Sequence, residues 1–127
     1  MRILPLLLCL VAGSAHAQTS TSSTPTPVPS WVPKTGAQLN GLDKITARLT
    51  PLNVKVGETI TFRTLKITLR GCQVRGPDQP ADSAAFLDIT DTAASNFAFH
   101  SWMLVSNPAL AVLEHPVYDV KLLGCTP

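Results

Sequence analysis

The sequence predicts a mostly β fold, a small antiparallel β-sandwich or barrel of about seven strands, with one short helix near residues 108–114 and one disulfide. Three observations predict it. Apolar and polar residues alternate with a period of two over several short segments, as in half-buried strands. Turn-forming residues separate these segments at intervals of about 8–12 residues. Two cysteines, Cys72 and Cys125, remain once the N-terminal leader is removed, and an even count in an exported chain predicts one bridge.

The first strands are expected between residues 44 and 70. Residues 44–50 alternate, with their apolar side chains on one face, which predicts a half-buried strand that Pro51 ends or bulges. A turn is expected at Gly57, because glycine favours tight turns. Two further alternating segments, 59–62 and 65–70, are then expected to be strands.

The middle of the chain continues the pattern. Gly71 interrupts the alternation, which resumes with shifted parity, and a β-bulge would produce that shift. Residues 75–83 carry the turn formers of a loop, and residues 84–90 are expected to form a strand. After a polar turn, residues 97–105 predict a long strand whose second half is apolar on both faces.

The last elements are a short helix and a strand. Asn107 and Pro108 suit a helix start, because Asn caps helices and Pro fits their first position. Residues 109–114 could then form about two turns before Pro116 stops them. Residues 117–123 alternate again and predict the final strand.

The N-terminus has the organisation of a signal peptide. Arg2 supplies a positive charge, residues 3–11 are almost entirely apolar, and residues 15–17 read Ala-His-Ala. These are the three parts of a secretory signal, with cleavage expected after Ala17. A membrane anchor would need about 20 apolar residues, and no later segment could span a bilayer. The mature chain is therefore expected in the periplasm or outside the cell.

Residues 18–41 are rich in Ser, Thr and Pro and predict a disordered linker. Trp31 is its exception, either a terminus tucked loosely onto the domain or a contact motif for a partner. A single domain is expected over residues 42–125, followed by a tail of residues 126–127. The formal net charge of the whole chain is +2, and its Lys and Arg residues are spread singly. Electrostatic capture of nucleic acid needs clustered cations, so we exclude nucleic acid as a partner.

Catalysis by a serine nucleophile has weak support. Ser101 or Ser106 could be combined on paper with His115 and Asp119. The G-x-S-x-G elbow is missing, and Pro116 prevents the helical spacing that would bring His115 and Asp119 together.

Carboxylate pairs and metal ligands are the other chemical options. Asp88 with Asp91, or Glu114 with Asp119, could serve a glycosidase if each pair met in one cleft. Glu114, His115 and Asp119 are the densest set of metal-ligating types, but a metal site needs three or four convergent ligands. We assign no catalytic residue, cofactor or metal, and we expect this segment to form a rigid helix-to-strand corner.

A binding face is the remaining candidate. His100 and Trp102 share one face of the expected strand 97–105. The sequence favours a core position for Trp102, whereas an outward Trp beside a His would suit contact with a protein or a sugar. The candidate face consists of His100, Trp102, Glu114, His115, Tyr118 and Asp119.

Several segments also resemble those of a known family. They read LDKITARLTPLNVKVGETITFRTLKITLRGC, AAFLDI and SWMLVSNPALAVLEHPVYDVKLLGC, and lie within about residues 42–125. They are similar to segments of small secreted proteobacterial proteins known only as a domain of unknown function. Members of that family keep a Cys in the places of Cys72 and Cys125. The resemblance implies export and the bridge, and it implies no activity.

These observations predict an exported cell-envelope protein that works as a non-catalytic interaction or structural module, with another envelope protein as its partner. The alternative is a small cell-wall hydrolase or glycan-binding domain. A hydrolase would require its carboxylates to lie together in one concave cleft.

Overall fold

The structure is a computed structural model, and it describes residues 12–15, 17–25 and 30–127. Residues 12–15 and 17–25 contain neither helix nor strand. The strands are β1 (Trp31–Lys34), β2 (Gly36–Asp43), β3 (Arg48–Lys55), β4 (Thr59–Phe62), β5 (Leu65–Arg75), β6 (Ser83–Asp91), β7 (Ala98–Leu104) and β8 (Tyr118–Thr126), with one 3-10 turn, η1 (Pro108–Leu110), before β8. Within the described part of the chain, no helix is long and apolar enough to cross a membrane.

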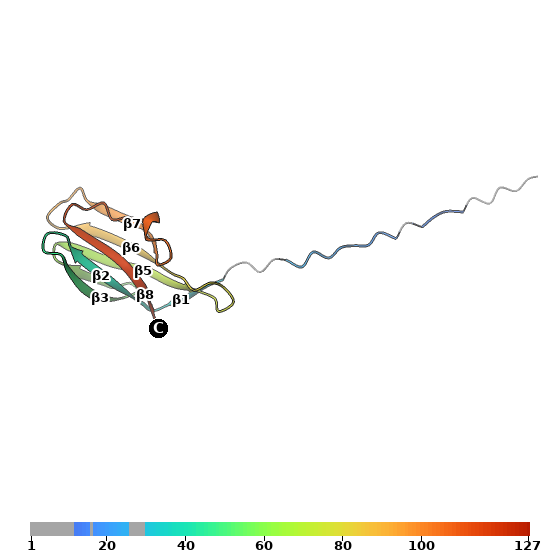
Figure 1. The fold of residues 1–127 in the computed structure, drawn as a ribbon, viewed down its shortest axis with the longest axis horizontal. Coiled ribbons are helices and arrows are strands. Elements are labelled where there is room, and N and C mark those ends of the chain that lie inside the picture. The colour runs from blue at the N-terminus through green and yellow to red at the C-terminus, as the bar shows by residue number, and fades with distance from the viewer. Residues whose placement is uncertain (1–11, 16, 26–29) are drawn as a thin grey trace, which may run out of the picture.

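The strands form two antiparallel sheets that pack face to face (Figure 1). The larger sheet has the order β1-β5-β6-β7, and β4 also pairs with β5. The smaller sheet has the order β3-β2-β8. Strand pairing is antiparallel throughout, so the predicted mostly β, antiparallel fold is confirmed.

The core lies between the two sheets, where apolar side chains from alternate positions of each strand meet. The larger sheet contributes Leu65, Ile67, Leu69, Cys72, Ala85, Leu87, Ile89 and Met103, and the smaller sheet contributes Ala37, Leu39, Val54, Val120 and Leu122. Leu113 enters the same core from the segment between η1 and β8. Because strand side chains alternate, the intervening residues of the larger sheet point away from this core.

One bridge joins the two sheets. The sulfur atoms of Cys72 on β5 and Cys125 on β8 are 2.02 Å apart, and their Cα atoms are 5.7 Å apart. The predicted disulfide is confirmed. The two cysteines are separated by 53 positions, and closing such a loop stabilises a fold by about 4 kcal/mol on the chain-entropy model.

Other local predictions are confirmed. The register of β5 against β6 shifts between Leu69 and Gly71, where the sequence predicts a bulge. Gly57 has φ +85° and lies in the turn between β3 and β4. Residues 76–82 form the expected loop, and the strand predicted over 84–90 is β6.

The predicted extent of the linker is wrong at its C-terminal end. Residues 31–34 and 36–43 form β1 and β2, and Ala37 and Leu39 are buried. β2 is the central strand of the smaller sheet, so part of the expected linker belongs to the domain. The predicted tail is also too long, because Thr126 belongs to β8.

The strand predicted over residues 44–50 is also wrong in its first half. Residues 44–47 form the turn between β2 and β3, and Ala47 has φ 56°. The Asp43 carboxylate accepts hydrogen bonds from the N–H groups of Ile45 and Thr46, at 3.0 and 3.2 Å, which favours a turn over an extended strand. Pro51 lies within β3, whose register continues without a shift. Proline is tolerated there because β3 is an edge strand.

The predicted two-turn helix is a single 3-10 turn, η1. Asn107 occupies its N-cap without a side-chain capping bond, and none of its three residues is buried. A short helix needs an apolar face packed on the fold, and η1 has none. The chain instead runs on to place Leu113 and His115 in the interior.

Candidate functional site

The side of the larger sheet that points away from the core carries several aromatic and charged side chains. We call it the outer face. Its members are Trp31 on β1; Lys66, Arg70, Gln73 and Arg75 on β5; Phe86 and Asp88 on β6; and His100 and Trp102 on β7. The register sets Trp31 opposite Arg75, Phe86 opposite Trp102, and Asp88 opposite His100. Side chains on directly paired residues are neighbours on one face, so these pairs lie side by side.

Two tryptophans from distant parts of the chain line one hollow on this face. Its volume is about 260 Å³, and we call it the aromatic hollow. Its lining residues are Trp31, Gln73, Ala84, Trp102 and Leu104. The guanidinium carbon of Arg75 lies 4.6 Å from the centre of the Trp31 ring, a cation–π contact that covers one face of that ring.

Trp102 points outward, so the core position favoured by the sequence is wrong. Its side chain is 41% exposed, whereas its neighbour Met103 is only 4% exposed and occupies the core. The Phe86 ring packs edge-on against the Trp102 ring, with centroids 5.3 Å apart. A Cβ atom on Gly71 would lie 4.0 Å from the Trp102 ring. Gly71 at the bulge therefore lies directly beneath the indole, and a Cβ atom there would make an ordinary van der Waals contact with it.

A charged group adjoins the aromatic hollow. Asp88 accepts a hydrogen bond from Nε of Arg70 at 2.5 Å and contacts Nδ1 of His100 through its other oxygen. The hydrogen bond from Arg70 is the main reason why the pKa of Asp88 lies below its usual value. Lys66, Arg70, Asp88 and His100 help to line a second hollow of about 350 Å³, the charged hollow. The Phe86 ring packs edge-on against His100, with centroids 4.7 Å apart. The same ring contacts Trp102, so Phe86 lies between the two hollows.

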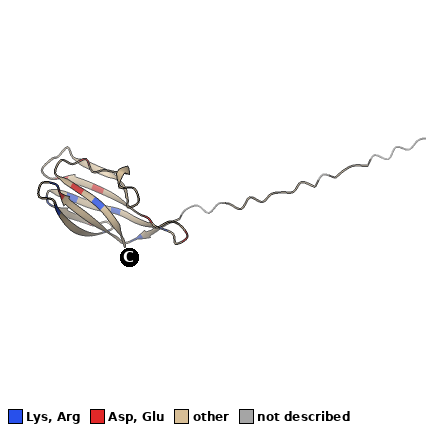
Figure 2. Ribbon diagram, viewed as in Figure 1, with Lys and Arg blue, Asp and Glu red and all other residues tan. Residues whose placement is uncertain are grey.

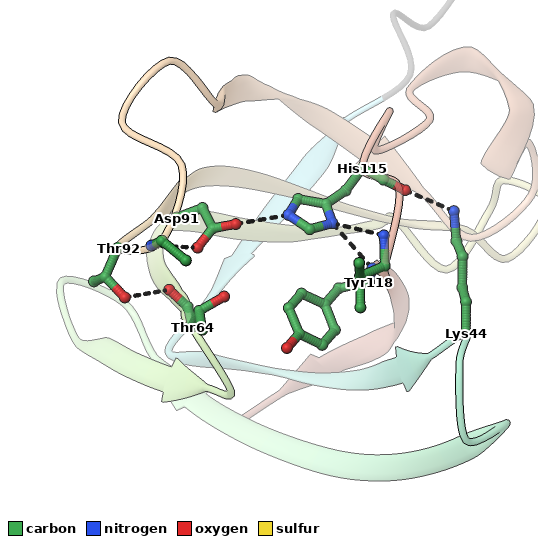
Figure 3. Close-up of polar contacts among 8 residues, drawn as sticks. Lys44, Thr64, Asp91, Thr92, His115 and Tyr118 are labelled. Carbon is green, nitrogen blue, oxygen red and sulfur yellow. Dashed lines mark hydrogen bonds and ion pairs between the residues drawn. The ribbon is translucent and has the colours of Figure 1, made fainter.

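A second polar group is buried at one end of the sandwich. Nε2 of His115 lies 2.8 Å from a carboxylate oxygen of Asp91, and each side chain is 4% exposed (Figure 3). Nδ1 of His115 accepts hydrogen bonds from the N–H groups of Val117 and Tyr118, both at 3.0 Å. Because Nδ1 acts as an acceptor, the imidazole proton lies on Nε2 and is donated to Asp91. The other oxygen of Asp91 accepts from the N–H of Ala93 at 2.8 Å.

We call Asp91, His115 and Tyr118 the clasp, because their contacts join the end of β6 to the start of β8. The Tyr118 ring stacks on the imidazole at 5.1 Å, and Nζ of Lys44 donates to the carbonyl oxygen of His115 at 2.8 Å (Figure 3). The hydrogen bond from His115 is the main cause that lowers the pKa of Asp91. A hollow of about 550 Å³ adjoins the pair, and Glu114 lines it. Both ring nitrogens are already bonded within the fold, so this histidine has no nitrogen left to exchange a proton with a bound molecule.

The structure separates the six residues of the predicted binding face. His100 and Trp102 lie on the outer face, and His115 and Tyr118 belong to the clasp. Glu114 is exposed beside Phe97. The carboxylate of Asp119 accepts the N–H of Val120 on β8. The helix expected to lead into the corner at residues 114–119 is replaced by a 3-10 turn and an extended segment. At this corner, His115 accepts the N–H groups of Val117 and Tyr118.

Neither carboxylate pair considered for a hydrolase, Asp88 with Asp91 or Glu114 with Asp119, lines a common hollow. Asp91 and Glu114 do line the same hollow, but both oxygens of Asp91 are bonded to His115 and Ala93. Asp88 points to the outer face and Asp91 into the interior, because the two lie at positions of opposite parity on β6. Across residues 12–15, 17–25 and 30–127, no three His, Cys, Asp or Glu side chains are grouped so that they could hold a metal ion. Positive and negative residues are interspersed over the strands (Figure 2).

The sequence prediction missed most of the outer face. Trp31 had one signal, since a lone tryptophan is unusual in a Ser/Thr/Pro-rich segment. Arg70, Phe86 and Arg75 had none of their own. To find them one must know which residues of β5 and β6 pair on either side of the bulge at Gly71. The sequence pattern locates the bulge but does not give this pairing.

Comparison with known proteins places the chain in a family. An uncharacterised protein of Rickettsia prowazekii (strain Madrid E) is 29% identical over 94 residues, which make up 72% of this chain and 61% of that protein. The chain thus matches less than two thirds of the length of this relative. No solved structure matches the chain. The family model of uncharacterised proteins conserved in bacteria, DUF2155, matches residues 37–125, and the chain belongs to this family.

Proposed function

We propose that this protein is exported to the cell envelope and works there as a non-catalytic binding module, with the outer face as its contact surface and another envelope protein as its partner. The aromatic hollow is the observation that carries this proposal. The chain has two tryptophans, and both line that hollow. Tryptophan and arginine are the residue types most enriched at the energetic centres of protein interfaces.

The surroundings of the hollow also suit an interface. Trp102 stays 41% exposed in the isolated chain, so a partner would remove considerable apolar surface from water. The sheet beneath it is held by strand pairing and by the Cys72–Cys125 bridge. A rigid platform loses little conformational entropy on binding.

The polar groups favour binding over hydrolysis. Both nitrogens of His115 and both oxygens of Asp91 are bonded within the fold. Asp88 is engaged by Arg70 and His100. A two-carboxylate hydrolase needs a proton donor and a base on either side of its substrate, and Asp88 and Asp91 lie on opposite faces of their strand.

Export is supported by the N-terminal pattern and by the cysteines. Residues 1–17 have the charge, apolar run and Ala-x-Ala site of a secretory signal, although most of them lie outside the described residues. Cys72 and Cys125 lie at disulfide distance, and such bridges persist in oxidising compartments.

A crosslinked affinity purification from the cell envelope tests the proposal. Tagged wild type, Trp102→Ala and Leu49→Ala are compared. Leu49 is a matched control because it is 63% exposed on β3, in the other sheet. Cys72→Ala serves as the fold-loss control.

We expect one envelope protein to be recovered with wild type and Leu49→Ala and lost with Trp102→Ala. Equal recovery with Trp102→Ala would exclude the outer face as the contact surface. Recovery of cell-wall glycan in place of a protein would favour the glycan-binding alternative.

A further inference from the structure

We infer that the outer face recognises an acidic, extended peptide segment, in which one large apolar side chain enters the aromatic hollow and carboxylates meet Lys66 and Arg70. This inference rests on the proposed function and specifies the chemistry of the partner. Three features of the outer face support it: its excess positive charge, the shape of the aromatic hollow, and the spacing between the two hollows.

Charge is the first feature. The outer face carries three permanent cations, Lys66, Arg70 and Arg75, against one carboxylate, Asp88. Both oxygens of Asp88 are already engaged, by Arg70 and His100. Lys66 is exposed, and its ammonium group has no hydrogen bond or ion pair with any described residue. Arg75 lies over Trp31, outside the charged hollow, so Lys66 is the cation of that hollow that no carboxylate compensates. An approaching carboxylate meets this charge and the guanidinium of Arg70 beside it.

The shape of the aromatic hollow favours an inserted side chain. Trp31 forms one wall, but Arg75 already covers one face of its ring. Trp102 forms another wall and is packed edge-on by Phe86. The volume of the hollow is about 260 Å³. A hollow bounded by tryptophan side chains can take up an apolar anchor side chain from a partner.

The spacing of the hollows defines the segment. Ala84 lines the aromatic hollow and Asp88 lines the charged hollow, four positions apart on β6. On β7, Trp102 and His100 line the same two hollows two positions apart. A strand rises about 3.3 Å per residue, so the lining residues of the two hollows lie roughly 7–13 Å apart. An extended peptide spans that distance in about two to four residues, and the recognised segment should carry its apolar anchor at that spacing from its acidic group.

Selection from a display library of random peptides, with the mature chain as the bait, tests this inference. We expect an enriched consensus that joins a large apolar residue to Asp or Glu about two to four positions away. Selected peptides are then synthesised and titrated against the wild type and three variants: Lys66→Glu, Trp102→Ala and Lys55→Glu. Lys55 is a matched control because it is an exposed lysine at the end of β3, in the other sheet.

We expect Lys66→Glu and Trp102→Ala each to weaken binding on the order of tenfold or more, while Lys55→Glu leaves it unchanged. Added salt should weaken binding further, because the contacts are exposed. A consensus without acidic residues, or equal effects of Lys66→Glu and Lys55→Glu, would overturn the inference.

The test separates this inference from the proposed function. If no peptide is enriched while the envelope purification still depends on Trp102, the contact surface is right and the acidic peptide is wrong. If a partner is recovered equally with Trp102→Ala, the contact surface itself is wrong. Far-UV circular dichroism of each variant establishes that it is folded.

Discussion

His115 shows how one side chain fixes a corner of this fold. Its Nδ1 accepts two backbone N–H groups from the start of β8, and its Nε2 donates to Asp91 at the end of β6. The ring is enclosed by Phe97, at 4.7 Å, and by Tyr118, at 5.1 Å. An imidazole with two bonded nitrogens and two aromatic neighbours is held by the fold, and this explains why a histidine can be buried without acting as an acid or base.

Replacing His115 should therefore reduce stability according to which bonds are lost. His115→Ala removes the acceptor, the donor and the ring packing, and we expect it to lower the free energy of unfolding by on the order of 2 kcal/mol or more. In His115→Asn the amide oxygen can replace Nδ1 as the acceptor, so the loss should be smaller. Urea unfolding of both variants measures this. Equal stability of wild type and His115→Ala would show that the clasp does not stabilise the fold.

Alternation in the sequence predicts those strands that have one clearly buried face. It locates β5, β6 and β8, and the bulge at Gly71, because their apolar positions face the core at regular intervals. It fails for residues 44–50, where Ile45 is 77% exposed in a turn. Alternation there has no core to face, and the local hydrogen bonds to Asp43 determine the conformation.

β2 was missed because its composition resembles that of a linker. In its sequence, GAQLNGLD, all residues except the two leucines are small or polar, and two of them are glycines. Such residues are unfavourable for an isolated strand. Gly41 is needed because a Cβ atom there would come within 2.8 Å of the Phe62 ring. This segment becomes a central strand because β3 and β8 pair with it on either side, although its local preferences do not predict a strand.

The candidate site depends on pairing that the sequence does not reveal. The outward position of Trp102 follows from Met103 occupying the core. Trp31 lines the same hollow because β1 pairs with the end of β5. Local patterns identify the residues as unusual, and only the strand order brings them together.

The position of β2 leads to a truncation experiment. A mature chain that begins at Ser30 retains every strand, whereas one that begins at Leu42 lacks β1 and most of β2, including the buried Ala37 and Leu39. We expect the first to unfold cooperatively and the second to be unfolded or aggregated, because the smaller sheet would lose its central strand. Thermal circular dichroism distinguishes them. A cooperative transition in the shorter chain would show that the domain begins near residue 42 after all.

At the scale of the whole molecule, acid should weaken the fold. The pKa values of Asp43, Asp82, Asp88 and Asp91 all lie below the ordinary value of 3.8. For Asp82, burial raises the pKa, but hydrogen bonds from Ser106 and Ser83 outweigh that effect. A carboxyl whose pKa is lower in the folded state stabilises the fold above its unfolded pKa, and that contribution is lost as the pH falls through the folded pKa.

We therefore expect the free energy of unfolding to be nearly constant from neutral pH to about pH 5 and to fall below about pH 4. In Asp82→Asn the amide can keep bonds to Ser83 and Ser106 without titrating, so the fall should be shallower. Urea unfolding over this pH range measures both slopes. An identical slope in Asp82→Asn would mean that Asp82 does not contribute to the acid sensitivity.

The outer face gives the molecule two unlike sides. The larger sheet presents Trp31, Trp102 and His100 outward, and the smaller sheet has no aromatic residue on its strands except Tyr118, which is half-buried in the clasp. Binding through the larger sheet would leave the smaller sheet free. Exposed positions on the smaller sheet can therefore serve as negative controls for positions on the outer face.

Photo-crosslinking from single positions in living cells tests this claim most directly. A photoreactive p-benzoyl-phenylalanine replaces either His100, 71% exposed on the outer face, or Leu49, 63% exposed on the smaller sheet. If the outer face is the contact surface, position 100 yields a discrete protein adduct in the envelope and position 49 yields none. An adduct from position 49 alone, or the same adduct from both positions, would contradict it.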